Sequence, residues 1–179
     1  MRNICVVYDS GNNAMEMAAR LLCDVFRKEG SNASAYDAVT VDPGVLHDVD
    51  TLVFGSRCSF GTVSADFKRF MESTEDFWYQ QPWRNKFAAG FTLSSCNSMY
   101  KLNTLQVLEQ FAAYHGMHWI GLGVLPRFVC GQQSEGQNRF SCHAGLAIQY
   151  TDTGSSVEFH PGDLLTLELF AMRILEIKN

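Results

Sequence analysis

The chain has 179 residues, 46% of them apolar and 18% charged, and its formal net charge is −5. With roughly 150 residues per domain as a guide, these values indicate one globular domain over residues 1–179 and exclude a disordered chain. The acidic balance also argues against a protein that binds nucleic acid through backbone phosphates.

Five segments have the composition of strands, and several are continuous apolar runs. Such runs are typical of strands buried on both faces of a parallel sheet. The segment at 33–36 is weaker than the others. The predicted strands are residues 4–8, 33–36, 51–55, 87–93 and 117–122.

Helices are predicted between these strands because apolar residues there recur at helical spacing. The first runs from residue 14 to Gly30, the second follows a cap at Thr62 or Ser64, the third begins near Leu102, and the last covers 164–177. The aromatic cluster at 77–79 and Trp83 is predicted to lie in a connection.

Residues 124–160 do not fit this alternation. They contain a stretch rich in glycine, serine and glutamine and two short strand-like runs, at 146–150 and 157–159. We interpret the segment as an insertion or a decorated crossover near the fifth strand. The fold class predicted from the whole pattern is α/β, a doubly wound, five-stranded parallel sheet with helices on both faces.

The N-terminal apolar stretch is too short for a signal peptide or a membrane span, so we expect neither secretion nor membrane insertion. The six cysteines include no C-x-x-C pair. Free thiols in a cytoplasmic protein are therefore expected.

Ligands of doubly wound sheets bind at the carboxyl ends of the strands, where polar loops occur at 9–15, 56–62 and 94–99. The first loop joins hydroxyl and amide side chains to the start of a helix, which suits a phosphate dianion. It matches neither G-x-x-x-x-G-K-[ST] nor G-x-G-x-x-G. The other two loops offer hydrogen-bonding groups and an apolar contact for a flat heteroaromatic ring. Together the three loops match the needs of flavin mononucleotide (FMN).

Four stretches, at 7–16, 54–61, 70–78 and 114–117, resemble the flavodoxin-like proteins, and within them the WrbA-type NAD(P)H:quinone oxidoreductases. The resemblance extends over the first 123 residues. The chain departs from the family at Asn13, where glycine is usual, and at Arg57, where proline is usual. Its third loop also lacks the family's glycines.

The resemblance implies bound FMN, NAD(P)H as co-substrate, a quinone acceptor, and a homo-oligomer in which aromatic residues of a neighbouring subunit help to cover the flavin. It implies that the flavin carries the chemistry and that no side chain is a nucleophile. Tyr114 takes the place of a flavin-contacting histidine, as a possible donor to the flavin edge, and Trp78 that of a tryptophan over the substrate. By position, the cofactor-binding residues are Ser10, Gly11, Asn12, Asn13, Ala14, Met15, Ser56, Arg57, Cys58, Ser59, Phe60, Gly61, Ser94, Ser95, Cys96, Asn97, Ser98 and Met99.

Two other functions stay open. One is a flavodoxin-like electron carrier or flavin-binding module that does not turn over NAD(P)H, and the other is a structural or regulatory protein whose altered third loop no longer binds flavin. Burial in the core or at an interface explains Trp78 as well as substrate contact does. A thiol partnership of Cys58 and Cys96 with the flavin, and a metal site at Cys130, Cys142 and His143, are minor alternatives.

Overall fold

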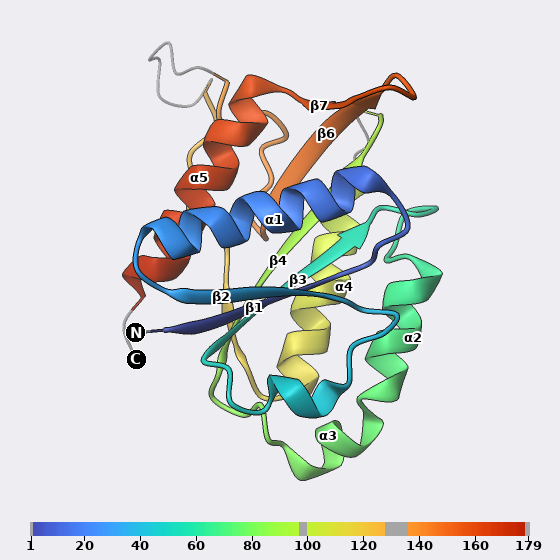
Figure 1. Cartoon of the computed structure of the whole chain (residues 1–179), viewed down its shortest axis with the longest axis vertical. Helices are drawn as coiled ribbons and strands as arrows, with labels where there is room; N and C mark the ends of the chain where they lie inside the picture. The colour runs from blue at the N-terminus through green and yellow to red at the C-terminus, as the bar shows by residue number, and fades with distance from the viewer. Residues whose placement is uncertain (1, 97–99, 128–135, 178–179) are drawn as a thin grey trace.

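A computed structural model describes residues 2–96, 100–127 and 136–177 of the chain. Its centre is a sheet in the order β2-β1-β3-β4-β6-β7, with β5 also paired to β4 (Figure 1). The pairs are parallel except β6 with β7, which is antiparallel. The strands are β1 (Asn3–Tyr8), β2 (Asn32–Asp37), β3 (Thr51–Arg57), β4 (Phe87–Ser94), β5 (His118–Ile120), β6 (Leu146–Asp152) and β7 (Val157–Phe159).

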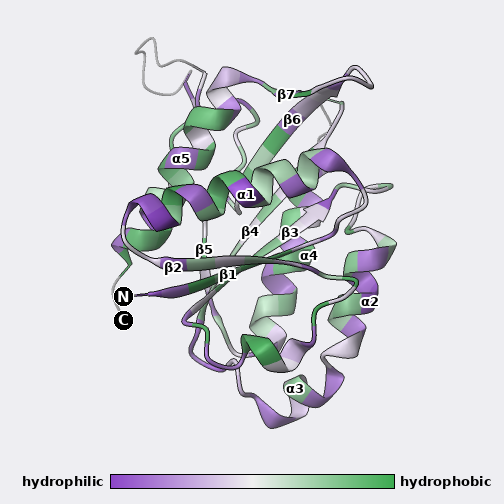
Figure 2. Cartoon of the chain, in the orientation of Figure 1, coloured by the Kyte–Doolittle hydropathy of each residue, from purple (hydrophilic) through white to green (hydrophobic). Residues whose placement is uncertain are grey.

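Helices cover both faces of this sheet. On one face α1 (Asn13–Lys28) packs against α5 (Pro161–Glu176), and on the other lie α2 (Ala65–Ser73), α3 (Glu75–Gln80) and α4 (Lys101–Tyr114) (Figure 1). A 3₁₀ turn at Pro43–Leu46 joins the second face. Along the helices apolar and polar segments alternate (Figure 2), as expected for elements that bury one side only. The predicted fold class is confirmed.

The continuous apolar run of β1 has a simple structural reason. Ile4 and Val6 pack into the core under α1 and α5, while Cys5 and Val7 pack into the core under α2 and α4. Because successive side chains point to opposite faces of a strand, both sets must be apolar when both faces are covered.

The fifth strand position is filled by two separate pieces. β5 pairs with the start of β4, from Phe87 to Ala89, and β6 pairs with its end, from Phe91 to Ser94. A Cβ on Gly145, just before β6, would lie 2.4 Å from the Gly90 carbonyl oxygen, so the close approach of β6 to β4 needs a glycine there. The segment between β5 and β6 thus interrupts the fifth strand position, and the runs at 146–150 and 157–159 are strands.

One predicted connection was wrong in part, because Trp83 lies in a turn but residues 77–79 do not. Residues 77–79 lie in the short helix α3, not in a loop. Glu75 and Asp76 stand in its first turn, where acidic side chains favour a helix start. None of its residues is buried, so no apolar periodicity marked it. The other predicted elements are present with small shifts at their ends. Of the helices that the structure describes, none has the length and apolar character needed to cross a membrane.

Candidate functional site

The three predicted loops meet at one edge of the sheet. β1, β3 and β4 are neighbours, and their carboxyl ends at Tyr8, Arg57 and Ser94 open into the first, second and third loops. The helix α1 begins at the same edge (Figure 1). This is the position at which doubly wound sheets bind ligands.

Asp9, the first residue after β1, joins the first two loops. Its side chain is fully buried and accepts four hydrogen bonds. One oxygen accepts from the backbone N–H of Arg57 at 2.7 Å and from the hydroxyls of Ser64 at 2.8 Å and Ser56 at 3.1 Å. The other oxygen accepts from Arg57 Nε at 2.6 Å. A buried carboxylate needs this degree of pairing to remain charged. Asp9 therefore fixes β1, the end of β3 and the start of α2 together.

Two polar side chains of the first loop, those of Ser10 and Asn12, are engaged within the protein, whereas Asn13 is exposed. Ser10 Oγ donates to Asp37 Oδ2 at 2.7 Å. Asn12 is the N-cap of α1, where its Oδ1 accepts from the Met15 N–H at 2.9 Å, and its Nδ2 donates to the Tyr150 hydroxyl at 3.1 Å. Because the first N–H groups of a helix have no partner within the helix, those of α1 before Met15 face the loop as donors. Of the groups that belong to this loop itself, the backbone N–H groups are therefore the main donors for an anion.

Arg57 lies across the first loop from the side of β3. Its Nε is bound to Asp9, its Nη1 donates to the Gly11 carbonyl at 3.3 Å, and its Nη2 lies 3.8 Å from Asp66 Oδ2. A Cβ on Gly11 would come within 2.1 Å of Nη2, so glycine is required for the guanidinium to lie here. The Arg57 side chain is 30% exposed, and the contact of its Nη1 with Gly11 lies at the surface, whereas that of Nε with Asp9 is partly buried.

The second loop ends in a tight turn that exposes an aromatic ring. Ser59 and Thr62 exchange backbone hydrogen bonds at 2.9 and 3.0 Å, and the two residues between them have positive φ, 47° at Phe60 and 85° at Gly61. Asn103 Nδ2 on α4 donates to the Gly61 carbonyl. Phe60 is fully exposed. An aromatic residue with positive φ costs on the order of 1–3 kcal/mol, and the paired turn holds it in that conformation.

A buried lysine binds the backbone of the third loop. Lys101, at the start of α4, is 1% exposed, and its Nζ donates to the Cys96 carbonyl at 2.7 Å and lies 4.2 Å from the ring centre of Phe140. Burial lowers the pKa of Lys101. Ser94 Oγ also donates to the Cys96 carbonyl, at 2.8 Å. The predicted site residues Asn97, Ser98 and Met99 lie outside the described part of the chain.

β6 brings two side chains to these loops that the sequence did not reveal. Besides the contact of Tyr150 with Asn12, Gln149 Nε2 donates to the Ser95 carbonyl at 3.3 Å. Asp163 fixes Gln149, because it accepts from the Gln149 N–H at 2.9 Å and from Arg139 Nε at 2.8 Å. The segment interpreted as an insertion therefore forms part of the candidate site. Only the alternation within the 146–150 run could have suggested it.

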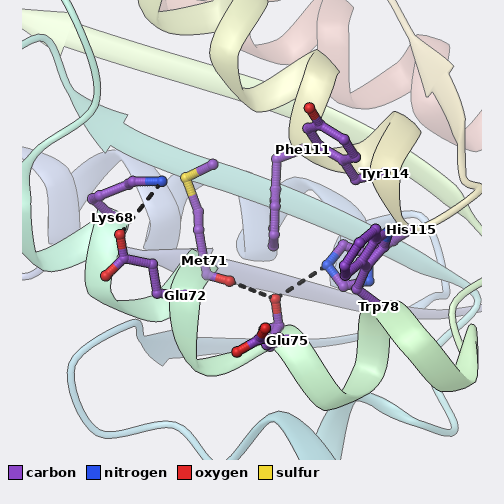
Figure 3. Close-up of a pocket in the computed structure, with 9 residues that line it drawn as sticks. Lys68, Met71, Glu72, Glu75, Trp78, Phe111, Tyr114 and His115 are labelled. Carbon is purple, nitrogen blue, oxygen red and sulfur yellow. Dashed lines mark hydrogen bonds and ion pairs between the residues drawn. The ribbon is translucent and has the colours of Figure 1, made fainter.

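Trp78 and Tyr114 lie together but away from the three loops. Tyr114 is the last residue of α4, which begins at the carboxyl edge and has 14 residues. At about 1.5 Å per residue the helix carries Tyr114 roughly 20 Å from that edge. The two rings meet edge to face at 6.4 Å and line a cavity of about 500 Å³ between α2, α3 and α4, together with Met71, Glu75, Phe111 and His115 (Figure 3).

His115 borders the same cavity and is neutral. Its ring is 1% exposed and lies 4.6 Å from Trp83 and 4.8 Å from Phe111, measured between ring centres. The Thr74 hydroxyl donates to the Met71 carbonyl at 2.7 Å, so its oxygen accepts from His115 Nε2, at 3.1 Å (Figure 3). The other nitrogen, Nδ1, is buried without a partner among the described residues. Burial lowers the pKa of His115 to about 4.

Acid should destabilise the fold through His115. Between the unfolded pKa near 6.5 and the folded pKa of about 4, the unfolded chain binds more protons than the folded one. Stability from this residue is complete above pH 6.5 and falls by about 3 kcal/mol as the pH drops to 4. Urea unfolding across this range should therefore show a shallower pH dependence in His115→Gln than in the natural chain. The exposed His118→Gln is the control, and equal slopes for all three proteins would contradict the assignment.

Comparison with known proteins agrees with this fold. Flavodoxin FldP of Pseudomonas aeruginosa is 26% identical to the chain over 99% of it and 97% of FldP. The crystal structure of a flavodoxin, WrbA-like protein from Agrobacterium tumefaciens superposes with a TM-score of 0.73 and 28% identity, covering 97% of this chain and 95% of that one. The chain has the flavodoxin-like fold. No protein-family model matches it.

Other relatives match the chain only in part. An NAD(P)H dehydrogenase (quinone) of Archaeoglobus fulgidus is 35% identical over 45% of this flavodoxin-like chain and 42% of its own length. Further proteins of that name, from Chromohalobacter salexigens and Sinorhizobium fredii, match over about half of their length. The shared part is thus smaller than a whole quinone dehydrogenase.

Proposed function

We propose that this flavodoxin-like protein binds FMN in the three loops and transfers two electrons from NAD(P)H to a quinone. The meeting of the loops at the carboxyl ends of β1, β3 and β4, beside the start of α1, is the observation that carries the proposal. The names of the partly matching relatives support the substrates. FMN, when bound, would supply the redox chemistry.

The donor groups present fit FMN. The first backbone N–H groups of α1, with the positive end of the helix dipole and Arg57 beside them, suit its phosphate. The rigid turn at Phe60 and Gly61 gives backbone N–H groups and an apolar ring for the flat part of the cofactor. The described part of the third loop, where Lys101 and Gln149 bind the carbonyls of Cys96 and Ser95, would add a further wall. The chain's part is therefore to bind and orient the flavin.

We also propose that Trp78 and Tyr114 act on the flavin of another subunit, because within one chain α4 separates them from the loops. This requires a homo-oligomer. Trp78, Tyr79 and Tyr114 are 41, 69 and 58% exposed, which leaves aromatic surface for such a contact. Sedimentation velocity at micromolar concentration should show a dimer or tetramer. A monomer that nevertheless reduces quinones would contradict this part of the proposal.

A second candidate function is an electron carrier that does not use NAD(P)H. It is favoured by FldP, the relative matched over 97% of its own length, which is named a flavodoxin. The carrier would use the same loops for FMN but would need no nicotinamide site.

The visible spectrum of the purified protein, followed anaerobically while NADH or NADPH is added, separates these functions. Bound flavin whose absorption bleaches with a nicotinamide, and returns when a quinone is added, is the expected result. Flavin that binds but ignores both nicotinamides would favour the carrier. A chain that takes up no FMN would contradict both candidates.

A further inference from the structure

We propose that Arg57, oriented by Asp9, makes this site select a flavin that carries a phosphate over one that does not. In this proposal, which rests on FMN binding, Arg57 Nε stays on Asp9 while Nη1 and Nη2 contact the phosphate. Arg57 is thus assigned to the phosphate end of the cofactor, although its position in the sequence suggested the edge of the flavin ring.

The first loop is surrounded by carboxylates, so a phosphate there would need a cation beside it. Asp9 lies under the loop, Asp37 accepts from Ser10, and Asp66 lies beside the guanidinium. A phosphate monoester carries about −1.5 to −2 charges near pH 7 and would be repelled by three carboxylates. Arg57 is the cation that the described residues place against Gly11 in the middle of this loop.

Arg57 is held firmly at Nε, while its two outer nitrogens make only weak contacts. Its Nε hydrogen bond to Asp9 is short and lies against a fully buried carboxylate. Its outer nitrogens make weaker contacts, at 3.3 Å to the Gly11 carbonyl and 3.8 Å to Asp66. A phosphate oxygen would replace these with charge-assisted hydrogen bonds, which are about twice as strong as neutral ones. Asp9 therefore acts as a positioning residue that aims the free side of the guanidinium.

The hydroxyl and amide side chains of the loop carry no charge, and two of the three, Ser10 and Asn12, already have partners. Ser10 donates its proton to Asp37, and Asn12 uses both its oxygen and its nitrogen, on Met15 and Tyr150. The backbone N–H groups at the start of α1 carry only the partial charge of the helix dipole. The preference for a charged phosphate over the uncharged hydroxyl of riboflavin should then depend mainly on Arg57.

The test compares FMN with riboflavin. Each is titrated into the flavin-stripped full chain, and binding is followed by quenching of flavin fluorescence. In Arg57→Gln the ratio of FMN to riboflavin affinity should fall by about 10- to 100-fold, the effect of hydrogen bonds to a charged group, while riboflavin affinity changes by less than about threefold. Added salt should weaken FMN binding more in the natural chain than in this variant.

Arg20→Gln is the matched control, because it removes the same charge from the exposed face of α1, where Arg20 pairs with Glu16. Its FMN to riboflavin ratio should equal that of the natural chain. Arg57→Lys, which keeps the charge near Asp9 but loses the forked donors, should retain part of the preference and gives a second reading if Arg57→Gln folds poorly.

Two results would overturn the assignment: equal loss of FMN and riboflavin affinity in Arg57→Gln, or a natural chain that binds both flavins equally well. A natural chain that binds neither flavin would instead show that the proposed function itself is wrong, and the assignment would fall with it.

Discussion

Asp9→Ala is expected to lower the free energy of unfolding by about 3 kcal/mol, the lower end of the cost of breaking a buried ion pair. The variant leaves the Arg57 guanidinium without its carboxylate and removes the acceptor shared by the hydroxyls of Ser56 and Ser64. Because the Arg57 side chain is 30% exposed and can turn toward water, the upper end of that range is not expected. Urea unfolding followed by circular dichroism measures the change.

The control for this prediction is Asp37→Ala. Asp37 also accepts a hydrogen bond from the first loop, but that contact is exposed, so its loss should cost less than about 1 kcal/mol. In the double variant Asp9→Ala, Arg57→Ala the total loss should be smaller than the sum of the single losses, because neither charge is left without the other. An Asp9→Ala protein with an unchanged unfolding midpoint would show that the buried pair contributes nothing to stability.

Much of the fold could be predicted from local sequence. Burial is visible in the sequence of these elements. The strands β1, β3 and β4 contain continuous apolar runs because both of their faces are covered, and α1 has apolar residues at helical spacing because one side of it is buried. The helix α3 could not be predicted in this way, since it buries none of its residues. The split of the fifth strand depends on pairing with β4, which local periodicity does not record.

The sequence predicted which loops form the candidate site but not which side chains contact one another there. The alternation of strands and helices placed the three loops at the carboxyl ends of the strands, but the order that makes β1, β3 and β4 neighbours came from the structure. Asp9 and Arg57, however, are 48 residues apart in the sequence, and Asn12 and Tyr150 are 138 apart. Such pairs depend on the packed structure. The distance of Tyr114 from the loops follows from the length of α4, which the family resemblance alone did not take into account.

Trp83→Ala should cost about 3–5 kcal/mol, the usual range for removing a large buried aromatic side chain. Trp83 is fully buried between Phe77, Phe111 and His115, with ring centres at 5.5, 6.4 and 4.6 Å. This cluster joins α3 and α4 below the cavity that Trp78 and Tyr114 line. The loss should be seen as a lower midpoint in urea unfolding, whereas Trp78→Ala, at a position 41% exposed, should change stability by less than about 1 kcal/mol.

Trp83→Phe separates packing from polarity at this site. The Trp83 Nε1–H is buried and has no acceptor among the described residues, and an unsatisfied buried donor costs about 1–3 kcal/mol. Phenylalanine keeps most of the ring contacts and removes this cost, so its loss of stability should be well below that of alanine. If Trp83→Phe were as destabilising as Trp83→Ala, the unsatisfied Nε1–H would not carry the cost assigned to it, and the shape of the indole ring would be what the cluster requires.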